Sequence, residues 1–281
     1  TLPEDVVGAQ YLVFHTNAYS QLVELEEGNN DRALPISISG QPTITLNHFA
    51  NNTLQEPGAT FTALAQLSQK GDEKALNARA VEACTIDMGG PLSTLANTVR
   101  IASEITSAGA PGDAVGLSNS SLRLRSGEDD LVIEALLLGP AVGESVAVRN
   151  SLVSGNRGND TITLDAEIWG DRALIFGGAG NDTITCYGIG RDSFIQAGAG
   201  DDTVSVGRLE TTPGAPWLDR PNGPPVRPST VRGGDGFDAL ILLGISQADF
   251  EAQADWFVEP GEQGWLFQGA RFSGFEQISF G

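Results

Sequence analysis

Residues Val153 to Val206 decide the fold, because one nine-residue phrase recurs within them. It reads Gly-Asn-Arg-Gly-Asn-Asp-Thr-Ile-Thr at 155–163, Gly-Gly-Ala-Gly-Asn-Asp-Thr-Ile-Thr at 177–185 and Ala-Gly-Ala-Gly-Asp-Asp-Thr-Val-Ser at 197–205. A fourth copy, Gly-Gly-Asp-Gly-Phe-Asp-Ala-Leu-Ile, occupies 233–241, and a degenerate one, Tyr-Gly-Ile-Gly-Arg-Asp-Ser-Phe-Ile, occupies 187–195. Such self-similarity indicates a repeat architecture in which each copy stacks on the next.

The residue types within the phrase predict a metal-binding turn. Glycines at the second and fourth places let a six-residue loop adopt positive φ and bring its carbonyl groups close together. The aspartate at the sixth place supplies a hard oxygen ligand, and the next three residues alternate polar, apolar and polar as in a short strand. Because Ca²⁺ binds six to eight oxygens at roughly 2.3–2.6 Å, one loop is not enough, and a second loop stacked on it would supply the remainder.

The spacing of the aspartates supports this stacking. Asp160 and Asp182 are 22 residues apart and Asp182 and Asp202 are 20 apart, with Asp192 midway between the last two. Half-coils of about ten residues would therefore alternate between two sides of a flattened right-handed coil. One side would carry Asp160, Asp182, Asp202 and Asp238, and the other Asp192 with Asp171 as a weak companion. The apolar residues expected to point inward are Ile162, Leu174, Ile184, Phe194 and Val204.

The repeated phrase resembles the G-G-x-G-x-D-x-U-x nonapeptide of the RTX (repeats-in-toxin) calcium-binding family, over about residues 150–281. The resemblance implies an all-β fold, a right-handed parallel β-roll or β-solenoid, with several Ca²⁺ ions bound in its turns. It also implies a bacterial protein, secreted or on the cell surface, that leaves by type I export and folds outside on binding calcium. The metal-site residues that it implies are Gly155, Arg157, Gly158, Asp160, Gly177, Ala179, Gly180, Asp182, Ala197, Ala199, Gly200, Asp202, Gly233, Asp235, Gly236 and Asp238, with Asp192 on the second side.

A simpler interpretation of the same residues stays open, namely turns that bind nothing. Asn-Asp and Asp-Asp pairs favour turns by themselves, without a metal. Against it stands the recurrence of the aspartate at the same place after the glycines in four copies.

Composition narrows the possible partners. The chain has 281 residues, 35 of them glycine, with 16 Lys and Arg against 36 Asp and Glu, so that its net charge is −20. A charge of this sign argues against nucleic acid and anionic membranes as partners. It also makes the metal-free chain repel itself around the loops, so we expect metal binding and folding to be coupled. Cys84 and Cys186 favour buried thiols, although a disulfide between them stays open, and no apolar run predicts a transmembrane helix.

We expect three regions: an N-terminal β-rich region of unknown family at 1–115, the β-roll at 116–245 and a C-terminal aromatic cap at 246–281. In the first region, strands are predicted at Tyr11–His15 and Gln21–Leu25, and a hairpin from Ile36–Gly40 and Thr43–Asn47. Short helices are possible interpretations of Ala63–Lys70 and Asp72–Val81, whereas the alternation through Arg79–Asp87 equally fits early coils; we favour β structure with one or two short helices.

Two stretches depart from the repeat within the second region. Gly127–Val132 has Asp130 at the ligand place and Val132 at the apolar place but lacks the glycine pair, which predicts a coil that has lost its metal. The segment 211–230 holds six prolines and Trp217, so it cannot pair into a ladder and should project from one half-coil. It is either a neutral surface insertion or a loop that binds other protein subunits or cell-surface components.

The sequence lacks the common catalytic motifs. Its two histidines, His15 and His48, do not form a helical H-E-x-x-H, and it has no G-x-S-x-G and no P-loop. We therefore expect a non-enzymatic structural or adhesion scaffold. The alternatives are a calcium-dependent polysaccharide-active enzyme on a β-solenoid and a secretion and folding module of a larger effector.

Overall fold

The computed structural model describes residues 10–15, 31–36, 43–46, 49–55, 60–69, 77–88, 95–107, 112–138, 143–207, 229–259, 262–267 and 270–281. Contacts divide the chain into two compact units, Thr1–Pro42 and Thr43–Gly281. In the first unit, β1 (Gln10–His15) pairs antiparallel with β2 (Asp31–Ile36), which confirms the strand expected at Tyr11–His15. The strand expected at Gln21–Leu25, and most of that at Ile36–Gly40, lie outside the described residues.

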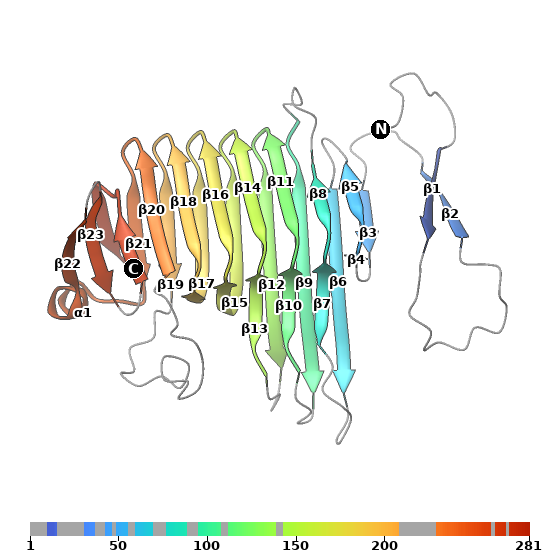
Figure 1. Cartoon of the computed structure of the whole chain (residues 1–281), viewed down its shortest axis with the longest axis horizontal. Coiled ribbons are helices and arrows are strands. Elements are labelled where there is room, and N and C mark those ends of the chain that lie inside the picture. Colours follow the sequence, from blue (N-terminus) through green and yellow to red (C-terminus); the bar gives the residue numbers. More distant parts are fainter. Residues whose placement is uncertain are drawn as a thin grey trace. The chain divides into compact units, whose positions relative to one another are not determined.

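The second unit contains two large sheets, and the chain alternates between them (Figure 1). The expectation of a mainly β fold with parallel sheets is confirmed, since every described pair in this unit is parallel except β22–β23 and β23–β24. Sheet 1 contains β3 (Thr43–Leu46), β4 (Phe49–Ala50), β6 (Thr60–Gln69), β7 (Ala78–Glu82), β9 (Thr98–Ser107), β10 (Ala114–Ser118), β12 (Asp130–Leu138), β13 (Ser145–Arg149), β15 (Thr161–Asp171), β17 (Thr183–Arg191), β19 (Thr203–Gly207), β21 (Ala239–Leu243) and β25 (Gln277–Phe280). Sheet 2 contains β5 (Thr53–Gln55), β8 (Thr85–Asp87), β11 (Ser121–Ser126), β14 (Leu152–Arg157), β16 (Leu174–Ala179), β18 (Phe194–Ala199), β20 (Ser229–Asp235), β22 (Asp255–Glu259), β23 (Glu262–Phe267) and β24 (Ala270–Ser273).

Parallel stacking starts well before residue 116. Thr43–Leu46 is a strand as expected, but its described partner is β6, in parallel, and not a hairpin neighbour. β10 pairs in parallel with both β7 and β13. The region boundary expected between residues 115 and 116 therefore falls inside β10, within one continuous stack of paired strands.

The short helices considered near residues 63–81 are wrong for the described part of that stretch. Ala63 lies in β6 and Ala78–Val81 in β7. Phe61 and Ala63 alternate into the core, and this burial decides for strand over the helix propensity of the alanines. Residues 70–76 lie outside the described part.

Residues that point between the sheets form the core. Ile162, Ile184 and Val204 are fully buried in sheet 1, as expected. Leu174 is instead 47% exposed and Phe194 only partly buried, so the inward orientation expected for both is wrong. Their successors in sheet 2, Ile175 and Ile195, are the fully buried residues.

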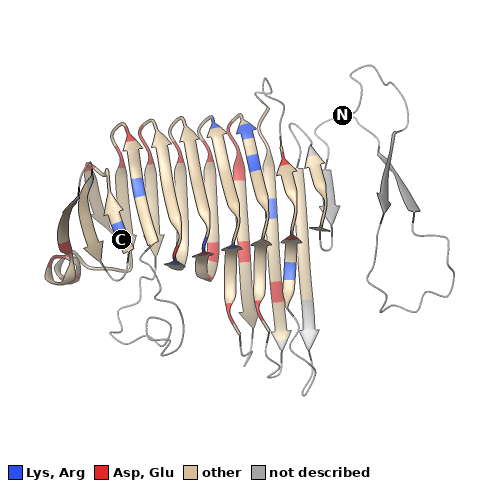
Figure 2. Ribbon diagram, in the orientation of Figure 1, with Lys and Arg blue, Asp and Glu red and all other residues tan. Residues whose placement is uncertain are grey.

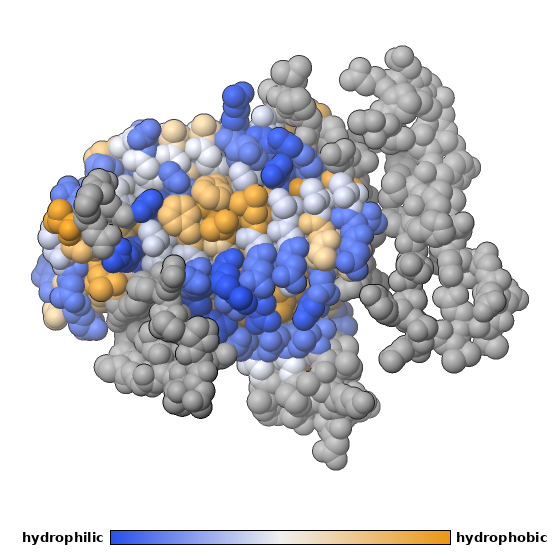
Figure 3. Space-filling model, in the orientation of Figure 1, coloured by the Kyte–Doolittle hydropathy of each residue, from blue (hydrophilic) through white to orange (hydrophobic). Residues whose placement is uncertain are grey.

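The inward positions are shifted by one residue because the turns that lead into sheet 2 differ from the turns that lead into sheet 1. Arg172 and Asp192, which lead into sheet 2, have left-handed φ values of 55° and 49° and are followed by a single residue before the strand. Side chains of a strand alternate between faces, so a shift of one residue exchanges the inward and outward sets. Leu174, Phe176 and Phe194 consequently give sheet 2 a hydrophobic area on its outer face (Figure 3).

The proline-rich insertion does not interrupt sheet 2. Its expected range, 211–230, overlaps the start of β20, and residues 208–228 lie outside the described part. β20 pairs with β18 in the same register as β18 with β16, with Thr230 beside Phe194 and Phe194 beside Leu174.

The C-terminal residues continue both sheets and add a small aromatic core. β24 pairs in parallel with β20, and β25 with β21. The one helix of the described residues, α1 (Gln247–Gln253), begins at Ser246, whose hydroxyl accepts a backbone N–H of the first turn. Phe250 of α1 contacts the rings of Trp265, Phe267 and Phe280. In the described part of the chain, no helix is long and apolar enough to cross a membrane.

Candidate metal centre

The candidate site is a row of buried aspartates at the turns that lead from sheet 2 into sheet 1. Thr161, Thr183, Thr203 and Ala239 are paired in register across β15, β17, β19 and β21. The residue before each of these is an aspartate, so the structure brings together the four aspartates predicted for one side. They are Asp160, Asp182, Asp202 and Asp238, each at most 1% exposed. Acidic residues follow this line of turns in Figure 2.

One carboxylate oxygen of each aspartate accepts a hydrogen bond from the neighbouring coil, where a coil is one pass of the chain through sheet 2 and sheet 1. The backbone N–H of Asp160 donates to Oδ1 of Asp182 at 2.8 Å, that of Asp182 to Oδ1 of Asp202 at 2.7 Å, and that of Asp202 to Oδ1 of Asp238 at 2.9 Å. Glu276 ends the series, because its Oε2 accepts the N–H of Asp238 at 2.7 Å. The row therefore links successive coils through side chain and backbone.

The second carboxylate oxygen has no hydrogen-bond partner. Oδ2 is buried and unpaired in Asp160, Asp182, Asp202 and Asp238, and also in Asp129, one coil before Asp160. A buried polar atom without a partner costs about 1–3 kcal/mol, and more when it carries charge. Such atoms recurring along one row favour a further group beside them.

Burial also raises the pKa of these carboxyl groups, because it removes water from the charged form. The pKa of Asp160 is raised to about 8, that of Asp182 to about 7 and that of Asp202 to about 6. The pKa of Asp238 is raised as well, first by burial and then by the nearby carboxylates of Glu276, Asp201 and Asp235. A cation beside the row would reverse this trend, since it favours the ionised form.

The glycine at the first place of the phrase leaves room beside Oδ2. A Cβ added to Gly177 would lie 2.5 Å from Oδ2 of Asp182 and closer still to the carbonyl oxygen of Ala197. Gly155 and Gly233 have the same surroundings, with Oδ2 of Asp160 or Asp238 and a carbonyl oxygen of the next coil. A carboxylate oxygen and a backbone oxygen thus converge where a side chain would otherwise lie. Ala197 has a methyl group in this place, which partly fills it in the Asp202 coil.

The fourth-place glycines allow the coils to approach one another. Gly180 has a φ of 131°, and a Cβ on it would collide with the carbonyl oxygen of Gly158 in the preceding coil. The other fourth-place glycines, Gly158, Gly200 and Gly236, also have positive φ.

The predicted third-place residues lie at the exposed tips of the loops. They are Arg157, Ala179, Ala199 and Asp235. The carbonyl oxygens of Ala179 and Ala199 each accept one backbone N–H of the preceding coil, at 2.9 and 2.8 Å. Each carbonyl oxygen has a second lone pair, so these atoms can still act as ligands.

The turns that lead from sheet 1 into sheet 2, where a second metal side with Asp192 was predicted, are built differently. Asp192 is exposed, at the left-handed position that Asn150 and Arg172 occupy in neighbouring coils. Behind it a serine replaces the buried carboxylate, because the hydroxyl of Ser193 accepts the backbone N–H of Ala173 at 3.0 Å. Its expected companion, Asp171, lies among arginines, at 3.5–3.7 Å from the nearest guanidinium nitrogens of Arg149, Arg172 and Arg191. The structure therefore does not bring Asp192 to the buried row.

Sequence reasoning missed one member of the row, Asp129. The ligand place was expected at Asp130, which is wrong: Asp130 pairs in register with Thr161 and forms an ion pair with Arg100 at 3.2 Å. Asp129 is 2% exposed, and its Oδ1 accepts the backbone N–H of Asn97 at 2.6 Å. Leu131, and not Val132, is the buried apolar residue that follows.

A spacing in the sequence could have identified Asp129. Gly127 precedes it by two residues, as Gly158 precedes Asp160. The first place of this coil, however, is occupied by the buried Leu124 and not by glycine. Although Oδ2 of Asp129 is unpaired as well, the register puts a leucine side chain where later coils have glycine, so we expect no room for a ligand in this coil.

The residues of the row fit a hard divalent cation. Unpaired carboxylate oxygens and converging backbone carbonyls are the donors that Ca²⁺ takes. Among the residues that the structure describes, no three Asp, Glu, His or Cys side chains group closely enough to hold a metal by themselves. Backbone oxygens would therefore have to supply much of the coordination.

Comparison with known proteins returned no match, whether to protein-family models, to curated proteins or to solved structures. The functional argument accordingly rests on the residues of this chain.

Proposed function

We propose that this chain is a calcium-binding structural or adhesion scaffold of the bacterial exterior, secreted or held on the cell surface. Its fold would be a right-handed parallel β-roll that binds several Ca²⁺ ions between coils. The observation that carries the proposal is the row of buried aspartates whose Oδ2 atoms have no partner. The ligands would be these carboxylates and the backbone carbonyls of the glycine-rich loops.

Calcium suits the row better than other common metals. Zinc prefers nitrogen and sulfur ligands, whereas the row offers oxygen alone. Magnesium retains several waters and demands near-ideal octahedral geometry, which a dry turn between two coils cannot easily provide. Carboxylates on adjacent strands lie about 4.8 Å apart and repel one another. A divalent ion beside each pair would offset this electrostatic repulsion.

A structural role follows from the burial of these groups. Carboxylates that are at most 1% exposed cannot contact a substrate, but they can join one coil to the next. The chain has a net charge of −20 and would need cations to stack its coils. It would therefore remain unfolded at low calcium concentration and fold at high calcium concentration. This coupling supports export in an unfolded state. The proposed partners are other protein subunits or cell-surface components, and their predicted contact is the proline-rich segment 211–230 with Trp217.

A calorimetric titration of metal-free protein with CaCl₂, combined with far-ultraviolet circular dichroism, tests the proposal. We expect several ions to bind per chain and the β signal to increase as they do. Titration with MgCl₂ at equal ionic strength is the control for simple charge screening. Absence of calcium binding by protein of verified mass and metal content would contradict the proposal.

A further inference from the structure

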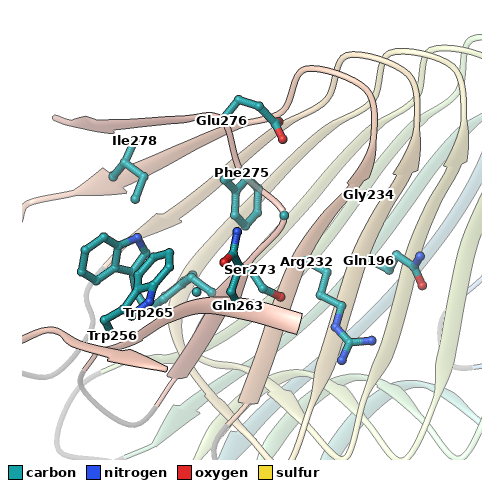
Figure 4. A pocket seen from close by; sticks show the side chains of 13 residues that line it. Gln196, Arg232, Gly234, Trp256, Gln263, Trp265, Ser273, Phe275, Glu276 and Ile278 are labelled. Atoms are coloured by element: carbon teal, nitrogen blue, oxygen red, sulfur yellow. The ribbon is translucent and has the colours of Figure 1, made fainter. Parts of the chain in front are cut away.

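A cavity of about 590 Å³ lies near the C-terminal end of sheet 2, lined by residues of β18, β20 and β22–β24 and by residues 274–276 and 278 (Figure 4). This volume is within the 300–1,000 Å³ that is usual for small-molecule sites. Its lining comes from β18 and β20 of the coils and from the residues that follow α1, so two structural parts meet in it. None of the buried aspartates of the metal centre lines it.

One end of the cavity is aromatic. Trp256 is 53% exposed, and its ring packs edge-on against that of Trp265, with centroids 4.6 Å apart and planes at 72°. Trp265 is held in turn by Phe250 of α1, at 5.6 Å. A large exposed indole that is supported from behind is pre-organised to stack on a flat, weakly apolar surface.

The rest of the lining combines apolar side chains (Phe272, Phe275 and Ile278) with polar groups of both charges. Gln196 and Gln263 contribute amides, Arg232 a guanidinium group and Glu276 a carboxylate. Figure 4 shows Arg232 and Gln196 at the end away from the two indoles, with Gln263 and Ser273 between them. Amide, guanidinium and carboxylate groups pair with hydroxyl groups, which both donate and accept hydrogen bonds.

We propose that this cavity binds a neutral carbohydrate, one or more sugar residues of a glycan. A sugar ring presents a face of C–H groups to an indole and a rim of hydroxyl groups to amides and charged side chains, which is the combination that the lining offers. A lipid or another fully apolar ligand would place hydrocarbon against the amides of Gln196 and Gln263. A polyanion would meet Glu276 and the net charge of −20.

The cavity is joined to the metal centre through Glu276. Its Oε2 accepts the backbone N–H of Asp238 at 2.7 Å, and Gly234 of the last glycine-rich loop lines the cavity. Calcium at the Asp238 turn would therefore order one wall of the sugar site. In this respect the inference rests on the proposed function, because it names the class of partner that a calcium-dependent adhesion module would hold.

The test uses the full chain, with calcium and after removal of metal. Cellopentaose, chitopentaose and maltopentaose serve as neutral probes and an oligogalacturonate as the acidic one, with binding followed by saturation-transfer NMR and calorimetry. We expect at least one neutral probe to bind, and Trp256→Ala to weaken it about tenfold or more. Phe237→Ala is the matched control, since Phe237 is an aromatic residue 56% exposed that does not line the cavity.

The outcomes separate this inference from the proposed function. Calcium binding without binding of any neutral probe overturns the carbohydrate site alone. Sugar binding by protein that takes up no calcium supports the site and overturns the calcium scaffold alone. Preference for the oligogalacturonate, or equal weakening by Trp256→Ala and Phe237→Ala, overturns the assignment to this cavity.

Discussion

The backbone N–H of Asp160 donates a hydrogen bond of 2.8 Å to Oδ1 of Asp182 in the next coil, while Oδ2 of the same carboxylate has no partner. The two oxygens of one side chain thus have different roles. Oδ1 joins one coil to the next, and Oδ2 is the atom that would bind a cation in the proposed function. An amide in place of the carboxylate would keep the first role and lose the charge needed for the second.

We expect Asp182→Asn to change stability in opposite directions with and without calcium. In metal-free buffer at pH 8 the variant should melt several degrees above the parent, because it no longer buries an ionised carboxylate. With calcium it should melt below the parent, because two neighbouring coils lose a ligand. Differential scanning calorimetry in both buffers measures this. Asp192→Asn, at an exposed position, is the control and should leave both melting temperatures nearly unchanged; the same response in the two variants would contradict the assignment of sides.

The stability of the metal-free protein should fall as the pH rises. The pKa of an aspartate is about 3.9 in an unfolded chain, whereas Asp160, Asp182 and Asp202 have values of about 8, 7 and 6 in the folded row. Between these limits the folded state binds more protons than the unfolded state, so the free energy of unfolding decreases with pH. The stabilisation that these raised pKa values give the folded state is complete below about pH 4 and is lost as the pH rises through about 6 to 8.

Urea unfolding of metal-free protein between pH 5 and pH 8 checks this trend. Asp182→Asn should show a shallower dependence, since one titrating group is removed. In saturating calcium the dependence should be weaker or reversed, because protons compete with the metal for the same oxygens. A rise in stability from pH 5 to pH 8 without metal would contradict the raised pKa values.

Exchange of glycine and alanine at the first place should alter calcium affinity in opposite directions. Gly177→Ala places a methyl group against Oδ2 of Asp182 and the carbonyl oxygen of Ala197, so we expect weaker binding. Ala197→Gly opens the same space in the next coil and should strengthen it. Calorimetry measures both, with Ala199→Gly as the control for loop flexibility, because Ala199 is an exposed third-place residue. Equal gains from the two alanine-to-glycine changes would indicate flexibility and not space.

The register of sheet 2 predicts a large difference between adjacent residues. Ile175→Ala should lower the free energy of unfolding by about 2–5 kcal/mol, because it removes a buried side chain from the core. Leu174→Ala should change it by about 0.5 kcal/mol or less, since the leucine is 47% exposed. Urea titration of both variants in calcium provides the measurement, and the reverse order would show that the strand is shifted by one residue.

Much of the buried row could be predicted from the sequence, because its signal is local. Glycines and an aspartate at fixed separation identified the turns of Asp160, Asp182, Asp202 and Asp238, and parallel pairing was expected from their recurrence. Asp129 was missed because its coil has Leu124 in place of the first glycine, so the phrase was aligned one residue late.

The predictions that differ from the structure depend on features outside the nine-residue repeat. The inward orientation of Leu174 and Phe194 assumed that both sides use one kind of turn, whereas the second side uses a tighter turn with a left-handed residue. The boundary expected between residues 115 and 116 falls inside β10 (Ala114–Ser118). Coils without glycine-rich loops are held by ordinary β pairing and core packing, as β10 between β7 and β13 illustrates.

A crystal structure grown in calcium, with anomalous difference maps, tests the central claim most directly. The account predicts peaks between adjacent coils, each about 2.3–2.6 Å from Oδ2 of an aspartate in the row Asp160, Asp182, Asp202 and Asp238. It predicts none beside Asp192 and none beside Asp129, where Leu124 fills the space. Calcium-grown crystals with the row intact and no peak at any of these four Oδ2 atoms would contradict it.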